Sequence, residues 1–173
     1  MNSPDYVELA SAIKRWGVEL GFAQIGIATT RLGDDEAHLL DWLALDRHGE
    51  MDYMQRHGTK RSRPADLHPG TVRVISARMD YDPPGARDGW EILDDPTLGY
   101  VSRYALGRDY HKLVRARLQK LADRITQEIG PFGYRAFSDS APVLEKALAR
   151  NAGLGWIGKH TCLIDHRAGS WFF

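Results

Sequence analysis

The sequence has 173 residues, of which 43% are hydrophobic and 27% are charged. A chain of this length buries one ordinary hydrophobic core and not comfortably two, so we expect a single domain over residues 1–173. The 23 basic and 23 acidic residues balance. This balance excludes a globally basic nucleic-acid-binding protein, so any RNA affinity is expected to be local.

Two further absences narrow the class of protein. No stretch approaches the roughly 20 apolar residues that cross a bilayer, and the N-terminus lacks the apolar region of a signal peptide, so we expect a cytoplasmic protein with no membrane contact. The only cysteine is Cys162. It excludes an internal disulfide, and it excludes an iron–sulfur cluster held by these residues alone, since such clusters take about four thiolates.

The first quarter of the chain predicts a helix, a strand and a second helix. Ser3 can cap a helix over residues 3–20 and Pro4 suits its first turn; residues 22–28 alternate like a strand. Small residues at Gly26 and Ala28 predict close packing against this strand. A helix over 34–47 is expected to turn its apolar residues towards the core: Leu39, Leu40, Trp42 and Leu43.

The middle of the chain predicts a basic loop, two strands and a long helix. The loop covers 60–64 and precedes a strand over 71–81, whose apolar residues on both faces indicate a central, doubly covered strand. Residues 82–99 are either a lid or a peripheral excursion. After a strand over 100–104, a helix over 109–129 carries a basic face that is either solvated or in contact with phosphates: Lys112, Arg115, Lys120 and Arg124.

Residues 138–160 combine an acid, a helix and a glycine-rich loop. Asp139 follows a predicted strand over 134–138, and its carboxylate could cap the helix that follows it. Glycines within 153–159 allow a ligand to approach the backbone, and 161–164 read as another strand. In a purely structural interpretation, Asp139 caps the helix, Gly153 ends it and Lys159 is solvated.

A phosphate-binding loop is the other interpretation of the glycine-rich segment. The spacing from Gly153 to Lys159 fits the first seven positions of the GxxxxGK[ST] pattern, but His160 replaces its hydroxyl residue. The predicted context is also reversed, because a helix precedes this loop and a strand follows it. Nucleotide binding is therefore disfavoured.

Asp109, Tyr110 and His111 resemble the start of Asp-x-His-x-x-Gly, a motif in which histidine binds cobalt. Val114 takes the place of the glycine, and the segment begins an amphipathic helix. We therefore interpret His111 as structural or as a polar neighbour of a site. The seven histidines provide no other metal-ligand pattern. The order of elements predicts an α/β (α+β) sandwich with a mixed sheet and flanking helices.

Several segments, in order along nearly the whole chain, together resemble epoxyqueuosine reductase. They are 60–64 (KRSRP), 69–75 (PGTVRVI), 102–111 (SRYALGRDYH), 139–149 (DSAPVLEKALA), 152–159 (AGLGWIGK) and 169–173 (GSWFF). The resemblance implies a nitroreductase-like cobalamin-binding core. It also implies two [4Fe–4S] clusters in a following ferredoxin-like module, which this sequence lacks, so a truncated piece is expected that binds no cluster and does not turn over alone.

The implied activity is the cobalamin-dependent reduction of epoxyqueuosine to queuosine at the tRNA wobble position, the last step of queuosine biosynthesis. The implied partners are the modified tRNA and an external electron donor, and a monomer is expected. A non-catalytic cobalamin carrier is the alternative function.

The two interpretations of Asp139 require opposite changes of its pKa. An ordinary aspartate is ionised at neutral pH, so a proton donor needs a pKa raised by burial or by an apolar ligand, whereas a helix cap stabilises the charged carboxylate and lowers the pKa.

The same resemblance implies roles for individual residues. Asp139 would donate a proton to the departing oxygen, and cobalamin would bind with its own lower base displaced and without a protein histidine on cobalt. The residues implied in cobalamin binding are Arg61, Ser102, Tyr104, Asp139, Gly158, Lys159, His160, Thr161, Leu163 and Ile164.

Overall fold

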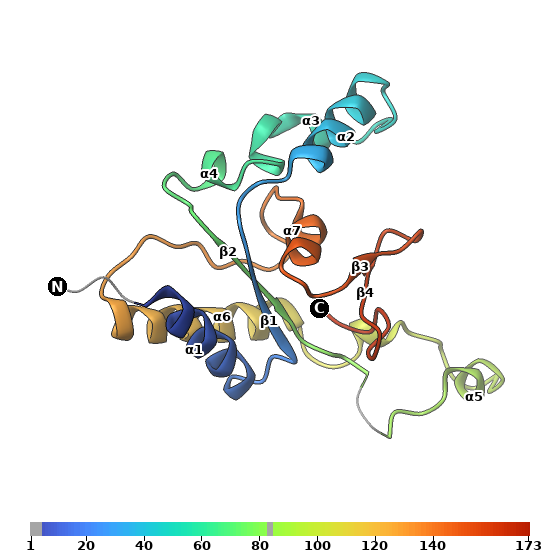
Figure 1. Cartoon of the computed structure of the whole chain (residues 1–173). Coiled ribbons are helices and arrows are strands. Elements are labelled where there is room, and N and C mark those ends of the chain that lie inside the picture. Colours follow the sequence, from blue (N-terminus) through green and yellow to red (C-terminus); the bar gives the residue numbers. More distant parts are fainter. Residues whose placement is uncertain (1–4, 83–84) are drawn as a thin grey trace.

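The computed structural model describes residues 5–82 and 85–173, so the predicted roles of Ser3 and Pro4 lie outside the described residues. Figure 1 shows the arrangement. The elements in chain order are α1 (Tyr6–Glu19), β1 (Gln24–Ala28), α2 (Gly33–Ala44), α3 (Tyr53–Arg56), η1 (Gly58–Arg61), α4 (Pro64–Leu67), β2 (Val74–Arg78), α5 (Gly89–Leu93), η2 (Arg103–Ala105), α6 (Tyr110–Ile129), α7 (Glu145–Asn151), β3 (Trp156–Ile157) and β4 (Leu163–Ile164).

Helix α1 begins at an acidic cap. The Asp5 side chain accepts hydrogen bonds from the amides of Val7 and Glu8, at 2.8 and 3.2 Å, and thereby satisfies two amides that lack intrahelical partners. The helix buries Ile13 and Trp16, as its apolar stripe predicts.

Strands β1 and β2 form an antiparallel pair, with Gln24 opposite Arg78 and Ala28 opposite Val74. Helices cover both faces of this pair (Figure 1). On one face, a Cβ at Gly17 of α1 would lie 2.1 Å from a side-chain atom of Ile25; on the other, a Cβ at Gly26 would lie 2.4 Å from the Ala152 carbonyl oxygen at the end of α7. The predicted close packing at Gly26 is therefore confirmed.

The chain beyond β2 pairs with residues 171–173. Met79 and Phe173 exchange two backbone hydrogen bonds, at 2.9 and 2.8 Å, and the Tyr81 amide donates to the Trp171 carbonyl at 3.0 Å. Successive residues of an extended strand direct their backbone hydrogen bonds to opposite edges. The Arg78 carbonyl accepts a hydrogen bond from the Ala23 amide on the β1 side. The predicted central position of this strand is thus confirmed near its end.

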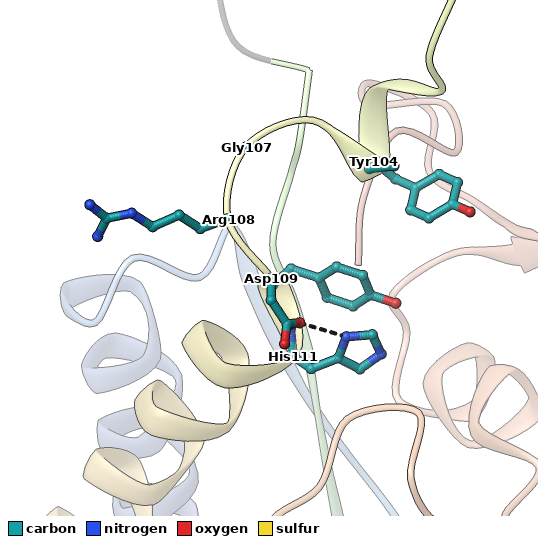
Figure 2. A pocket seen from close by; sticks show the side chains of 7 residues that line it. Tyr104, Gly107, Arg108, Asp109 and His111 are labelled. Atoms are coloured by element: carbon teal, nitrogen blue, oxygen red, sulfur yellow. Dashed lines mark hydrogen bonds and ion pairs between the residues drawn. The ribbon is translucent and has the colours of Figure 1, made fainter.

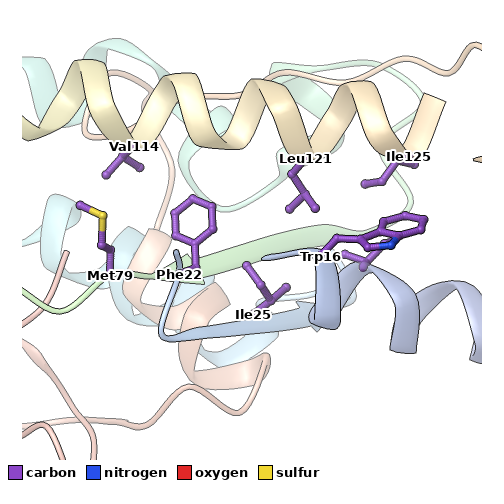
Figure 3. Packing of buried hydrophobic residues seen from close by; sticks show 8 residues of the cluster. Trp16, Phe22, Ile25, Met79, Val114, Leu121 and Ile125 are labelled. Carbon is purple, nitrogen blue, oxygen red and sulfur yellow. The ribbon is translucent and has the colours of Figure 1, made fainter. Parts of the chain in front are cut away.

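The main hydrophobic core lies between the β1–β2 pair and helices α1 and α6 (Figure 3). Its buried residues are Ile13, Trp16, Phe22, Ile25, Met79, Val114, Leu121 and Ile125. A smaller cluster of Leu32, Ala147 and Leu148 lies on the α7 side, with Val74 packed against it. The predicted helix over 109–129 is confirmed as α6, with Asp109 as its N-cap and Gly130 at its C-cap.

Three predicted elements differ from the structure. Residues 100–104 form no strand and instead lead into η2, and residues 134–138 form no strand either. Strand-favouring residues become a strand only where a partner edge is within reach, and near Met79 β2 already has β1 and residues 171–173 as partners. The predicted mixed sheet is also wrong, since the pairings within 5–82 and 85–173 are antiparallel.

Helix α2 was predicted to bury its apolar face, and it does not. None of its residues is buried, and Leu40 is exposed. The predicted basic loop over 60–64 forms the short turns η1 and α4. Residues 85–99 form a peripheral excursion that carries α5 away from the core (Figure 1).

Candidate active site

Asp139 does not cap the helix that follows it, which was the structural interpretation of this residue. Helix α7 begins only at Glu145, and its N-cap is Leu144, so Asp139 lies too early in the chain. Its backbone has φ +54°, a left-handed conformation that is uncommon for residues other than glycine. Its Oδ2 accepts a hydrogen bond from the Tyr110 hydroxyl at 2.5 Å and lies 3.4 Å from Nε2 of His111.

The first turn of α6 supplies both side chains that contact Asp139. The Asp109 carboxylate accepts from the backbone amide of His111 at 3.0 Å and lies 2.9 Å from Nδ1 of the same residue (Figure 2). The His111 side chain and then its amide lower the pKa of Asp109. The imidazole is therefore placed between two carboxylates, and its ring stacks on Tyr110 with centroids 4.1 Å apart.

Tyr110 is fixed by a second ring stack. Its ring lies nearly parallel to that of Phe173, at 3.8 Å, and Phe173 in turn contacts Tyr81 at 4.7 Å. Burial first, and then the hydrogen bond to Asp139, raise the pKa of Tyr110. The phenol therefore remains protonated and is a hydrogen-bond donor to Asp139 over the physiological pH range.

Glu145 brings another carboxyl group near Asp139. Although the residue is exposed on the surface, partial desolvation of its carboxyl group and then the charge of Asp139 raise its pKa. Like charges disfavour ionisation of both groups at once. The site therefore favours the protonated form of Glu145 more than water does.

A hollow of about 180 Å³ opens beside Asp109, Tyr110 and His111. It is lined by Tyr104, Ala105, Gly107, Arg108, Asp109, Tyr110 and His111. Figure 2 shows the Arg108 side chain pointing away from Tyr104 and His111, so its charge is directed elsewhere. Tyr104 is 53% exposed, and its ring is free to contact a ligand in this hollow.

Arg61 forms structural contacts in this structure. Its Nε donates to the Met54 carbonyl at 3.0 Å and one Nη donates to the Tyr53 carbonyl at 2.8 Å. Its own carbonyl accepts from the Leu144 amide at 2.8 Å. The side-chain bonds link η1 to α3 and the backbone bond links η1 to the start of α7, and the predicted contact from Arg61 to cobalamin stays a prediction.

The glycine-rich loop begins with a helix end. Bonds from the Gly153 amide to the Arg150 carbonyl and from the Leu154 amide to the Ala149 carbonyl complete a Schellman motif, so the structural interpretation of Gly153 is confirmed. The loop then enters β3 rather than a helix. This is not the strand–loop–helix order of a phosphate loop.

Strands β3 and β4 form a hairpin, with Trp156 opposite Ile164. The predicted strand over 161–164 is shorter than expected, because Thr161 has φ +66° and lies in the turn. The Thr161 amide donates to the Gly158 carbonyl, and the Gly158 amide donates to the Cys162 carbonyl, each at 2.9 Å. Lys159, His160 and Thr161 are exposed on this turn, Ile164 is half-buried and Leu163 is buried.

The structure brings together only some of the residues singled out in the sequence. Burial first, and then the neighbouring Cys162, Asp82 and Tyr104, raise the pKa of Tyr81, and Tyr104 also lies near Tyr110. Ser102 is exposed just before η2. No group of three or more His, Cys, Asp or Glu side chains in residues 5–82 and 85–173 is arranged to hold a metal ion.

Sequence reasoning missed two members of the site, Tyr110 and Glu145. Both lie in segments that carry the family resemblance, but no local pattern shows that a hydroxyl at position 110 bonds a carboxylate 29 residues later. His111 was expected to be structural or a polar neighbour of a site, and its contact with Asp139 agrees with the second description.

Comparisons with known proteins agree on one family. Residues 61–140 match the family described as "Epoxyqueuosine reductase QueG, DUF1730". A curated epoxyqueuosine reductase of Pseudomonas aeruginosa is 62% identical over 173 residues, which are all of this chain and 48% of that protein. The chain thus spans about half the length of the curated relatives it matches.

Solved structures show the same fold. A selenomethionine-labelled epoxyqueuosine reductase aligns with a TM-score of 0.78 and 21% identity, over 96% of this chain and 44% of that one. An epoxyqueuosine reductase solved with an epoxyqueuosine-modified tRNA-Tyr stem loop aligns with a TM-score of 0.72 and 19% identity, over the same shares. The segments quoted above, the shared fold and the identity to curated relatives together make this chain similar to about half of an epoxyqueuosine reductase.

Proposed function

We propose that this chain forms the cobalamin-binding half of an enzyme that reduces epoxyqueuosine to queuosine in tRNA. In this reaction both C–O bonds of the epoxide break, a C=C bond forms, and the oxygen leaves as water after the uptake of two electrons and two protons. The electrons come from an external donor. The protein must therefore bind the tRNA nucleotide, exclude water from the reacting carbons and deliver protons to the oxygen.

The arrangement of Asp139 is the observation that supports this proposal most strongly. A left-handed backbone at a residue other than glycine is uncommon and marks sites where geometry is constrained. Here that backbone directs the carboxyl group towards Tyr110 and His111, beside the hollow lined by Tyr104. A protonated Asp139 placed there is a general acid for the departing oxygen.

Exposed aromatic side chains, of which Tyr104 lines the hollow, suit a large ring such as a corrin, which is apolar on its faces and carries amides at its edge. Tyr104, Trp156 and Trp171 are each about half exposed, so their rings are available to contact an apolar ligand face. The hairpin turn at 158–161 offers exposed polar groups to the amides. When bound, cobalamin would supply the strong reductant that acts at carbon.

The histidine nearest the site is already engaged on both ring nitrogens, by Asp109 and Asp139. This supports cobalamin bound without a protein histidine on cobalt. The residues proposed to hold cobalamin are Arg61, Ser102, Tyr104, Asp139, Gly158, Lys159, His160, Thr161, Leu163 and Ile164. Because the Leu163 side chain is buried in the protein, its contact would come from the main chain.

Modified tRNA is the proposed substrate, and a line of exposed cations on α6 and just before it supports this proposal. We define the basic stripe as Arg108, Lys112, Arg115 and Lys120, which are exposed and form no ion pair within the described part of the chain. Arg124, predicted to share this face, instead pairs with Glu19 at 2.5 Å and stacks over Trp16. The solved relative that contains a modified tRNA stem loop agrees with this choice of substrate.

The remaining features form part of the same proposal. We infer a single domain with a nitroreductase-like sandwich, supported by α1 and α6 on one face of the β1–β2 pair and α7 on the other. We infer that the protein is monomeric and acts in the cytoplasm, and that two [4Fe–4S] clusters outside these residues pass electrons to the site. Within 5–82 and 85–173, every helix is too short or too polar to span a bilayer.

Titration with cob(II)alamin, followed by visible absorption and electron paramagnetic resonance, tests the cofactor part of the proposal. We expect saturable binding with displacement of the lower base and no histidine nitrogen coupling. Asp139→Asn is expected to retain binding, because the amide keeps the size of the carboxyl group. Reduction of epoxyqueuosine in tRNA, measured by mass spectrometry with the full-length protein, should fall about 10²- to 10⁴-fold in this variant.

Asp41→Asn, an exposed aspartate of α2, serves as the matched control and is expected to behave like the unchanged protein. Cobalamin binding without reduction of the tRNA by the unchanged full-length protein would instead support the carrier function. Absence of binding by the full-length protein would overturn the proposal.

A further inference from the structure

The proposed reaction consumes two protons, whereas the Asp139 carboxyl group carries one. If Asp139 is the only donor to the departing oxygen, it must regain a proton once within each turnover and once more before the next. A neighbouring group that returns protons to this carboxylate would speed both steps when the solvent is poor in protons. Such a group needs contact with Asp139, access to water and an exchangeable proton.

His111 meets these three conditions. Its Nε2 lies 3.4 Å from Oδ2 of Asp139, and its side chain is 46% exposed. Its Nδ1 lies 2.9 Å from the Asp109 carboxylate, which fixes the orientation of the ring. A protonated imidazole can donate to both carboxylates at once, whereas a neutral one can donate to only one of them.

We propose that His111 returns protons from solvent to Asp139 during epoxide reduction, with Asp109 holding the imidazole in place. This inference rests on the proposed function of the site. In each transfer the N–H bond at Nε2 breaks, an O–H bond forms on Asp139, and the neutral imidazole then takes a proton from water. No electrons move in this step.

The other ionisable groups around Asp139 are less suited to this role. Tyr110 donates to Asp139 at 2.5 Å, but its pKa is raised, so the phenol orients the carboxylate and does not give up its proton. Burial first, and then the charge of Asp139, raise the pKa of Glu145, but in the described part of the chain no hydrogen bond joins the two carboxyl groups. Lys112 faces Asp109, whose pKa its charge lowers, and Tyr104 faces Tyr110.

The test replaces the histidine and supplies an external proton carrier. His111→Gln in the full-length protein with cobalamin is expected to reduce epoxyqueuosine in tRNA at least 10-fold more slowly at pH 8. Imidazole buffer is expected to restore a concentration-dependent part of the rate, and lower pH should narrow the difference because solvent then protonates Asp139 directly. His38→Gln, which replaces an exposed histidine of α2, is the matched control and should show neither effect.

A loss of rate that imidazole and low pH leave unchanged would show a structural role for His111 and overturn the inference. An unchanged rate in His111→Gln would overturn it as well. These outcomes are informative because the unchanged protein must be active in the same assay; its inactivity would contradict the proposed function instead.

A readout without activity addresses the contacts themselves. Ring ¹⁵N nuclear magnetic resonance should show the Nε2 signal of His111 changing in Asp139→Asn and the Nδ1 signal changing in Asp109→Asn. His38 signals should be unaffected in both variants. If the Nε2 signal of His111 has the same chemical shift in Asp139→Asn as in the unchanged protein, His111 and Asp139 do not exchange protons, whatever the activity of the protein.

Discussion

The Tyr110 hydroxyl donates to the Asp139 carboxylate over 2.5 Å. This bond holds the carboxyl group of a residue whose backbone is left-handed. Tyr110→Phe removes the bond and keeps the stacks with Phe173 and His111, so we expect kcat for tRNA reduction to fall about 10-fold while KM changes little.

Thermal unfolding tells whether Tyr110→Phe acts through the site or through the fold. The melting temperature is expected to change little, because the ring and its packing remain. Tyr6→Phe, at an exposed tyrosine of α1, is the control. A large loss of stability with unchanged kcat would contradict a positioning role for Tyr110.

Asp165 should make the stability of the fold depend on pH in the acid range. Its carboxylate accepts from the amides of Ala168 and Arg167, both at 2.9 Å, and lies 3.0 Å from the buried Arg78 guanidinium. The Ala168 amide first, then the Arg167 amide and the Arg78 charge, hold the pKa of Asp165 at about 2, against an ordinary value of 3.8. Because the folded value is the lower one, the stabilisation is complete above about pH 4 and is lost as the pH falls towards 2.

Asp165→Asn should therefore lower the free energy of unfolding by about 1 to 3 kcal/mol at pH 7. Denaturant titrations at pH 7 and between pH 4 and 2 measure this, with Asp41→Asn as control. The difference between variant and unchanged protein should shrink across the acid range. A difference that stays constant down to pH 2 would assign the effect to packing rather than to ionisation.

Two glycines offer a matched test of the packing between β1 and α7. Gly26→Ala places a methyl group 2.4 Å from the Ala152 carbonyl oxygen, whereas Gly33→Ala meets nothing within 4 Å. We expect Gly26→Ala to cost about 1 to 3 kcal/mol, since backbone cannot move aside as easily as a flexible side chain. Gly33→Ala should be neutral or slightly stabilising, and equal urea midpoints for the two variants would show that the α7 contact is loose.

The basic stripe predicts a salt-dependent contact with tRNA. Lys112→Gln should weaken binding of the full-length protein to tRNA and lower the slope of log affinity against log salt by about 1. Lys14→Gln, an exposed lysine of α1, is the control, and binding should be measured by titration at several salt concentrations. Equal slopes in the two variants would place the tRNA elsewhere.

The structure also shows which features a sequence can predict. Helices α1 and α6 were predicted within a few residues, because the apolar spacing of a helix is a local signal. The predictions of strands over 100–104 and 134–138 were wrong, since strand pairing depends on which sheet edges the fold leaves open. Local pattern assigned Asp139 to a helix cap, but its positive φ and its bond to Tyr110 arise from contacts between distant segments.

The pairing of Met79 with Phe173 has a consequence for the time at which the site forms. Tyr110 acquires its stacking partner only when residues 171–173 have returned to the strand that they pair with. Contacts between residues more than 90 positions apart are slow to close, because the intervening chain must first be ordered. During synthesis, helices α1 and α6 can form early. The proton-donating geometry at Asp139 is therefore expected to be among the last features to mature.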